Sequence, residues 1–298
     1  MGRLLKEGAK LIGQGITGGE GSRALPRMLS YGTKVIAGVT PGKGGQEVSG
    51  VPIFNSVKEA LEQVGPVDGT VQFVPPQFVL GAVREAIEAG IKWILIGAEK
   101  VPTKDEAIIY ELAKENGVSV IGPSSVGLVN PKRRLRIGLI AAADTDRAYI
   151  PGNIAIISKS GSMTAEIGVH LKNNGLGVSW AVGIGGDLIP GTDFADFILE
   201  LEDDPNTKAS VIFGELGGTF EERVGELVKE RKIKKPVVAF IAGDFTTKLP
   251  SEVQFGHAGA VIEGKRGLPS EKRRILKEAG VKVADTIDDI ARLVKEGI

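Results

Sequence analysis

One histidine stands among small residues near the C-terminal end of the chain. His257 lies in the run Gly256-His257-Ala258-Gly259-Ala260, and the only other histidine, His170, falls inside a predicted helix. Small neighbours leave an imidazole uncovered and let reacting groups come close to it. The chain has no cysteine and no second histidine nearby, so we expect no metal site. The pattern favours a nucleophilic imidazole that forms a covalent intermediate.

Such an imidazole needs a carboxylate on its other ring nitrogen to fix the tautomer. Two acids are candidates: Glu215, in the run Gly-Glu-Leu-Gly-Gly, and Glu99, in the run Gly-Ala-Glu-Lys. Both follow a predicted strand and are therefore expected at the edge where open α/β sheets bind ligands. An exposed loop acid is the alternative interpretation of each.

A phosphoryl group on His257 would also need a binding site for its oxygens. The run Ser-Lys-Ser-Gly-Ser-Met-Thr, which contains Ser160, Gly161 and Ser162, follows one strand and opens a helix. A helix N-terminus offers free N–H groups and a partial positive charge to an anion. This run is therefore our candidate phosphate and substrate loop.

A second anion site is indicated near the N-terminus. Gly15, Gly18 and Gly21 follow the first predicted strand, at a spacing that resembles a dinucleotide loop without matching it. The next strand ends in Thr-Pro-Gly-Lys-Gly-Gly, where an NAD-binding fold would place an acid. The cation Lys43 suits a phosphorylated ribose instead, which both NADP and CoA carry.

Hydrophobic periodicity predicts that these loops join strands and helices in alternation, which is typical of parallel, doubly wound sheets. In the first half we expect strands at 10–13, 34–39, 51–54, 70–74, 92–96 and 118–121, and helices at 24–30, 57–64, 78–89 and 104–116. In the second half we expect strands at 153–157, 177–182, 210–213 and 237–241, and helices at 163–173, 194–202, 221–232, 271–279 and 288–295.

The 298 residues are enough for two domains. We expect a first domain over 1–130, an edge strand and linker over 131–150, and a second domain over 151–298. Lys plus Arg and Asp plus Glu both number 37, so bulk charge predicts neither nucleic-acid nor membrane binding. The absence of cysteine, of a signal sequence and of a long apolar run is compatible with the cytoplasm.

Seven runs together carry a family resemblance that extends over nearly the whole chain. In order they are GQGITGGEG, YGTKVIAGVTPGKGG, VPIFNSVKEA, SKSGSMT, VGIGGDLIPGTDF, GELGG and GHAGA. The chain resembles the α subunit of succinyl-CoA synthetase and its relatives. The resemblance implies a Rossmann-like CoA-binding domain followed by a flavodoxin-like domain that carries a phosphohistidine.

The resemblance also implies roles for particular residues. His257 is phosphorylated by ATP or GTP, with Glu215 and Glu99 as its orienting acids, and passes the phosphoryl group to a carboxylate, giving an acyl phosphate that the CoA thiol attacks. The implied partner is a β-type large subunit with an ATP-grasp fold, which binds the nucleotide and Mg²⁺. The implied CoA-binding residues are Gly15, Thr17, Gly18, Gly19, Lys43, Val74 and Pro75.

Three regions depart from succinyl-CoA synthetase and look more like ATP-citrate lyase. They are Gly122–Gly127, Ala165 in the phosphate loop and the run Ser251–Phe255. With its synthetase-like CoA loops, the chain resembles the small subunit of citryl-CoA synthetase, which forms citryl-CoA from citrate, CoA and ATP. A succinyl-CoA synthetase α subunit and a malate–CoA ligase subunit are the alternatives. A non-catalytic CoA-binding module and an NADP-dependent oxidoreductase are alternatives from other classes.

Overall fold

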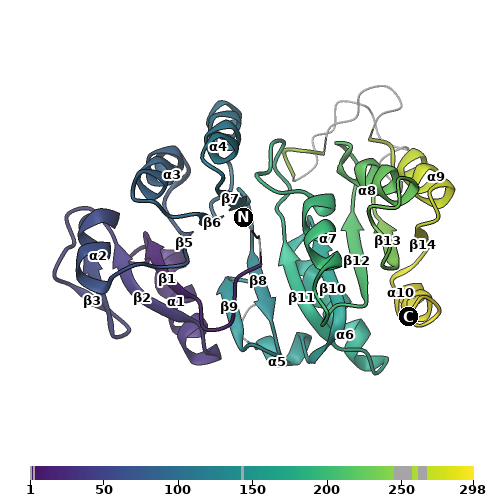
Figure 1. Ribbon diagram of the computed structural model, residues 1–298, viewed down its shortest axis with the longest axis horizontal. Coiled ribbons are helices and arrows are strands. Elements are labelled where there is room, and N and C mark those ends of the chain that lie inside the picture. Colours follow the sequence, from purple (N-terminus) through teal and green to yellow (C-terminus); the bar gives the residue numbers. More distant parts are fainter. Residues whose placement is uncertain (1, 3, 142–143, 245–256, 261–266) are drawn as a thin grey trace.

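The computed structural model describes residues 2, 4–141, 144–244, 257–260 and 267–298 of the chain. Two seven-stranded sheets lie side by side, each with helices packed against it (Figure 1). The predicted α/β class is therefore confirmed. Among the described residues, no helix is both long and apolar enough to cross a membrane.

The first sheet has the strand order of a Rossmann fold. Its order is β3-β4-β2-β1-β5-β6-β7, and all neighbours are parallel except β3 and β4. Numbered along the chain, the six parallel strands stand in the order 3-2-1-4-5-6. The strands are β1 (Lys10–Gln14), β2 (Lys34–Val39), β3 (Glu47–Val48), β4 (Val51–Phe54), β5 (Gly69–Gln72), β6 (Trp93–Ile96) and β7 (Ser119–Ile121). The helices are α1 (Gly19–Tyr31), α2 (Val57–Val64), α3 (Val79–Glu88), which follows a 3₁₀ turn at Pro76–Phe78, and α4 (Thr103–Glu115).

The second sheet has a flavodoxin-like core with an antiparallel extension. Its order is β14-β13-β12-β10-β11-β8-β9, and the five parallel strands stand in the chain order 2-1-3-4-5. The strands are β8 (Gly127–Asn130), β9 (Leu135–Gly138), β10 (Pro151–Ser158), β11 (Val178–Gly183), β12 (Ala209–Gly214), β13 (Val237–Ile241) and β14 (Lys282–Ala284). The helices are α5 (Thr145–Ala148), α6 (Gly161–Asn173), α7 (Phe194–Glu202), α8 (Phe220–Lys229), α9 (Pro269–Glu278) and α10 (Ile287–Lys295).

Alternation along the central strand β10 explains how helices cover both faces of the second sheet. Ile154 and Ile156 belong to one apolar cluster, together with residues of α6 and α10. Ala155 and Ile157 belong to another, together with residues of α7, α8 and α9. Successive side chains of a strand point to opposite faces of the sheet. A strand that is buried on both faces therefore has a continuous run of apolar residues in its sequence.

Each sheet has one point at which the strand order reverses. In the first sheet it lies between β1 and β5, and in the second between β10 and β12. Ligands of open α/β sheets bind outside the carboxyl ends of the strands at such a point. The loops after these four strands contain Gly15, Val74, Ser160 and Glu215. The topology therefore places the expected CoA loop and the expected histidine-orienting acid at two separate switch points.

Most predicted helices and strands are confirmed within a few residues, but local details differ. The spacing of Ser56 and Glu59 predicts a capping box at the start of α2, and the Ser56 hydroxyl accepts from Glu59 N at 3.1 Å. Thr103, with Glu106 three residues on, predicts an N-cap before a helix over 104–116, but this prediction is wrong, because α4 already includes Thr103 and the capping position is Pro102. The short strands β3, β8 and β14 were not predicted, nor was the helix α5 within the expected linker.

The two sheets share an apolar core and a polar seam. One cluster contains Leu11 and Trp93 of the first sheet and Trp180 and Ile212 of the second. The loop after β11 also binds the chain next to β7, because Gly191 N donates to Gly122 O at 2.9 Å and Thr192 Oγ1 donates to Val120 O at 2.5 Å. We refer to residues 184–192 as the junction loop.

Gly185 of the junction loop tests this seam. Its φ is +91°, and a Cβ there would lie 2.1 Å from Pro123 O. Gly175 also has a positive φ, +75°, but its Cβ would meet open space. Gly185→Ala should lower the free energy of unfolding by about 1–3 kcal/mol more than Gly175→Ala, because only the first adds a clash to backbone strain. Urea unfolding of both variants would measure this difference. Equal losses of unfolding free energy would contradict the close contact between Gly185 and Pro123.

Candidate functional site

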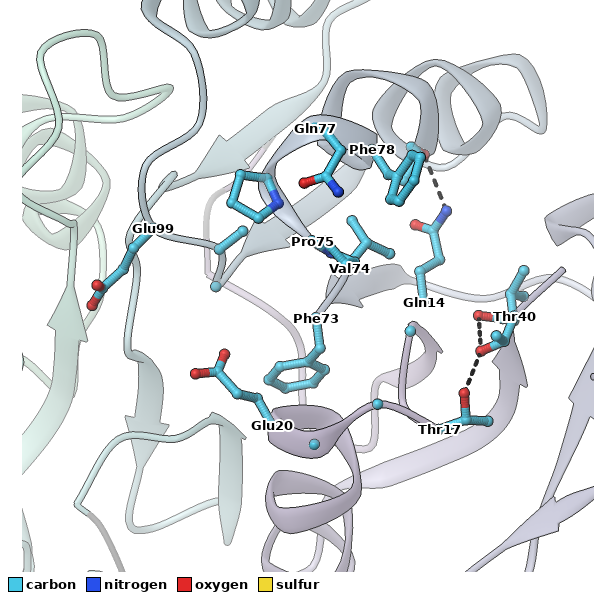
Figure 2. A pocket seen from close by; sticks show the side chains of 18 of the residues that line it. Gln14, Thr17, Glu20, Thr40, Phe73, Val74, Pro75, Gln77, Phe78 and Glu99 are labelled. Carbon is cyan, nitrogen blue, oxygen red and sulfur yellow. Dashed lines mark hydrogen bonds between the residues drawn. The ribbon is translucent and has the colours of Figure 1, made fainter.

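A cavity of about 1030 Å³ opens at the switch point of the first sheet (Figure 2). Its walls come from the loops after β1, β2, β5 and β6 and from the chain around Ser124. Of the CoA-binding residues expected from the sequence, those that line it are Gly15, Thr17, Gly18, Gly19, Val74 and Pro75. Sequence reasoning missed further lining residues, among them Arg23, Phe73, Gln77 and Phe78.

Two glycines let the loop after β1 pass close to its neighbours. Gly15 has a φ of +79°, and a Cβ there would lie 2.9 Å from the Phe73 backbone. A Cβ at Gly21 would lie 2.5 Å from the Cα of Ile16. The loop then enters α1, whose first turn begins at Gly19. The free N–H groups of this helix N-terminus lie at the cavity, as an anion site requires.

The cavity combines an apolar wall with polar groups and charged groups of both signs. Phe73, Val74, Pro75 and Phe78 line it, and Phe78 is 59% exposed. Figure 2 shows the hydroxyls of Thr17 and Thr40, 3.2 Å apart, on another side of the cavity. Arg23 adds a cation in α1, and Glu20, Glu85 and Glu99 add acids. A long ligand with both apolar and anionic parts suits this lining.

Lys43 lies beside this cavity and does not line it. Its side chain is partly exposed and its N–H donates to Thr40 O at 3.1 Å, within a turn that follows the lining residue Pro41. Asn55 fixes the same turn, because its Oδ1 accepts from Gly42 N and Gly44 N at 3.0 Å each. Lys43 therefore lies at the rim of the cavity, on a turn whose shape is fixed by hydrogen bonds to its backbone N–H groups.

His257 and Glu215 meet at the switch point of the second sheet. His257 Nδ1 lies 2.6 Å from Glu215 Oε1, and the two side chains are 35% and 14% exposed. Glu215 follows the last residue of β12, so the strand fixes its position. The hydrogen bond to Glu215 is the main cause of a raised His257 pKa, which burial opposes. The bond occupies Nδ1 and leaves Nε2 for chemistry.

A buried ionic cluster supports the loop that carries Glu215. Glu221, at the start of α8, accepts from Lys272 Nζ at 2.5 Å and lies 3.3 Å from Lys159 Nζ. The same carboxylate accepts from Glu215 N at 3.2 Å, and Lys272 also donates to Gly217 O at 2.6 Å. Burial alone would raise the pKa of Glu221, but the charges of Lys159 and Lys272 hold it below its usual value. These three residues were not singled out from the sequence.

The junction loop supports the other side of the histidine. A Cβ at Gly186 would lie 2.4 Å from the imidazole, so only glycine fits there. Gly259 N donates to Gly186 O at 2.9 Å and ties the histidine segment to this loop. Asp187 follows, and its charge acts on His257. This turn lies in the run VGIGGDLIPGTDF that carries the family resemblance, but the sequence gave Asp187 no role.

The other expected site residues lie in two different places. Glu99 is exposed and lines the cavity on the side away from Thr17 and Thr40 (Figure 2). The charge of Glu99 acts on Asp187, and the hydrogen-bonded partner of His257 is Glu215.

The residues of the expected phosphate loop open α6. They are Ser160, Gly161 and Ser162, and Ser160 Oγ lies 3.2 Å from Ser162 Oγ and caps the helix at Met163 N. The run Ser251–Phe255 lies outside the described residues.

Comparisons with known proteins match both halves of the chain. A CoA binding domain model matches residues 7–100, and a CoA-ligase model matches residues 157–282. Alpha subunit 2 of an ADP-forming succinate–CoA ligase from Archaeoglobus fulgidus is 44% identical over 99% of both chains. The chain belongs to the family of alpha subunits of ADP-forming acid–CoA ligases. These alpha subunits are parts of nucleotide-dependent ligases with a partner subunit.

Relatives within this ligase family differ in the acid that they are named for. A subunit of a sulfoacetate–CoA ligase from an Acholeplasma species is 42% identical over 96% of this chain and 95% of the relative. The alpha subunit of a malate–CoA ligase from Methylorubrum extorquens is 36% identical over 95% of this chain and 94% of the relative. Family membership therefore establishes the ligase class and leaves the acid open.

Solved structures add a likeness to a larger enzyme. ATP citrate lyase from Methanothrix soehngenii, in complex with citrate and coenzyme A, has a TM-score of 0.90 at 29% identity. The match covers 99% of this chain and 50% of that one, so this chain spans half the length of the lyase.

The first site prediction concerns the bond between His257 and Glu215. Glu215→Gln removes the largest cause of the raised His257 pKa, so that pKa should fall. A raised imidazole pKa stabilises the fold below the ordinary value of 6.5, and this stabilisation disappears as pH rises through the folded-state value. The variant should therefore lose more stability at pH values under 6.5 than in alkaline solution.

Proton NMR can follow this directly, because the chain has two histidines. His170 in α6 provides the internal control, since its charged neighbour is Asp288 of α10. A His257 pKa that stays the same in Glu215→Gln would contradict the assignment of Glu215 as its partner.

Proposed function

We propose that the chain is the phosphohistidine-carrying alpha subunit of an ATP-dependent ligase that joins an organic acid to CoA. The single observation that carries the proposal is the 2.6 Å contact between His257 Nδ1 and Glu215. A carboxylate at Nδ1 keeps the proton there and makes Nε2 the nucleophile. The raised pKa of His257 also agrees with an imidazole that Glu215 stabilises in its charged form.

The proposed ligase reaction has three steps. Nε2 attacks the γ-phosphorus of ATP and ADP leaves, with Glu215 compensating the positive charge that develops on the ring. A carboxylate oxygen of the acid then attacks the phosphorus and releases the imidazole, giving an acyl phosphate. The CoA thiol, as thiolate, attacks the acyl carbon and expels phosphate, giving the thioester.

Each substrate group has a proposed place. CoA occupies the cavity of the first sheet, with its phosphates at the loop Gly15–Gly19 and its chain along Val74 and Pro75. Lys43 at the rim binds the 3′-phosphate. The phosphoryl group on His257 binds at Ser160, Gly161 and Ser162 at the N-terminus of α6, and Glu99 is the second acid of the site. A β-type large subunit with an ATP-grasp fold supplies ATP and Mg²⁺.

Citrate is our first choice for the acid. The likeness to ATP citrate lyase covers nearly the whole chain, and the small residue Ala165 near the phosphate loop agrees with a larger, tricarboxylate acid. In this interpretation the protein is the small subunit of a citryl-CoA synthetase. Succinate and malate are the alternatives, supported by the names of the curated relatives.

The phosphohistidine can be tested by labelling. With the cognate β-type subunit, Mg²⁺ and γ-labelled ATP, wild type should take up acid-labile phosphate and His257→Ala should take up none. The affinity for CoA should stay within about threefold, because phosphoryl acceptance and CoA binding use different groups. His170→Ala is the matched control and should label as wild type does. Labelled His257→Ala protein would contradict the proposal.

The identity of the acid can be tested by competition. The reconstituted enzyme, given ATP and CoA, should form ADP with citrate at a kcat/KM at least about tenfold above that with succinate or malate, a difference of about 1.4 kcal/mol in transition-state binding. Mass spectrometry of the thioester identifies the product. Turnover with succinate alone would rule out citrate and leave the phosphohistidine proposal intact.

A further inference from the structure

Two acids are buried against each other at the seam between the sheets. Glu106, in the first turn of α4, is 2% exposed, and Asp187, in the junction loop, is 8% exposed. A hydrogen bond joins the two carboxyl groups. Since α4 packs with the first sheet and the junction loop follows β11 of the second, this bond crosses the seam.

The surroundings of this acid pair require a proton. Glu106 Oε2 accepts from Ile189 N at 3.2 Å, and none of the charged groups that act on Glu106 is a cation. Asp187 Oδ2 is buried and has no protein donor within the described part of the chain. Glu99 and His257 are the other charged groups that act on Asp187. A proton between the two acids gives each of them a hydrogen bond without a second buried charge.

Electrostatics agrees with this geometry. Burial is the largest cause that raises the pKa of Glu106 to about 7, and the charge of Asp187 adds to it. Burial also raises the pKa of Asp187, and Glu99 adds to that shift. Two adjacent buried carboxylates repel each other, so one of them keeps its proton. Below about pH 7 the pair therefore carries one negative charge instead of two.

The pair lies next to the histidine. Gly186, the residue before Asp187, packs on the imidazole so closely that a Cβ would lie 2.4 Å from it. Its carbonyl also holds Gly259, two residues after His257. The charge of Asp187 acts on His257. A second negative charge on the pair would therefore interact electrostatically with the imidazole of His257.

We propose that Glu106 and Asp187 share one proton, and that Glu106 is thereby a positioning residue that limits the negative charge beside His257. This inference rests on the proposed phosphohistidine, because a phosphoryl group adds up to about two negative charges to the ring. When the pair loses its proton, its second charge repels that group. Phosphoryl uptake should therefore fall as pH rises through about 7.

The shared proton can be tested on the full chain without any activity. Glu106→Gln keeps the shape and the acceptor for Ile189 N but cannot ionise. The side-chain ¹³C carboxyl resonance that this variant lacks belongs to Glu106, and in wild type it should titrate near pH 7. Titration near the ordinary value of 4.5 would overturn the proposal. Glu111→Gln, an exposed acid on the same helix, should leave that resonance unchanged.

The effect on His257 can be tested by the pH profile of phosphoryl uptake from ATP in the reconstituted enzyme. Wild type and Glu111→Gln should lose uptake above about pH 7, whereas Glu106→Gln should show no fall between pH 7 and 8.5, because loss of the imidazole's own proton only favours attack by Nε2. Asp187→Asn, a second variant that breaks the pair, should remove the same descending limb. A limb that persists in both variants would overturn the proposal.

The two proposals fail in different ways. If wild type takes up no phosphoryl group at any pH, the phosphohistidine and the charge-limiting role are both wrong. If wild type takes it up normally but the Glu106 carboxyl titrates as an ordinary glutamate, the inference alone is wrong.

Discussion

The active geometry depends on one hydrogen bond, between His257 Nδ1 and Glu215 Oε1. In the proposed reaction, the bond fixes which nitrogen of the ring faces the substrates and compensates positive charge on it. Glu215 can hold this position because Glu221 binds its backbone N–H, and Glu221 is held in turn by Lys159 and Lys272. A buried carboxylate with two cations tolerates loss of a partner poorly, because the remaining charges are then uncompensated.

The two candidate sites lie at the switch points of two different sheets. The first gathers glycine loops around a large cavity, and the second gathers Glu215, the start of α6 and His257. The junction loop connects them, since one side contacts Gly122 and Val120 and the other packs on the imidazole. Changes at the CoA domain can thus reach the histidine through a short path of direct contacts. In the proposed reaction, such a path would couple phosphoryl transfer to CoA binding.

The sequence predicts the class of fold well, because β-branched runs and amphipathic segments alternate with the periods of buried strands and covering helices. It also names Glu215 and Glu99 as the candidate partners of His257, because both acids follow a strand, and the structure selects Glu215 as the hydrogen-bonded one. Glu106, Lys272 and Asp187 could not be found in this way. Their roles arise from contacts between residues 51 to 83 positions apart, such as the bond from Ile189 N to Glu106. An isolated acid or lysine in a helix is usually exposed. Thr103 failed for a local reason, because the helix begins one residue earlier than its side chain suggested.

The most direct test asks which ring nitrogen carries phosphorus. The reconstituted enzyme, prepared with ¹⁵N-labelled histidine and incubated with ATP and Mg²⁺, can be studied by ³¹P–¹⁵N correlation NMR. The account predicts one phosphorus bonded to Nε2 of His257, with the proton retained on Nδ1 beside Glu215. Phosphorus on Nδ1, or on a residue other than His257, would contradict it.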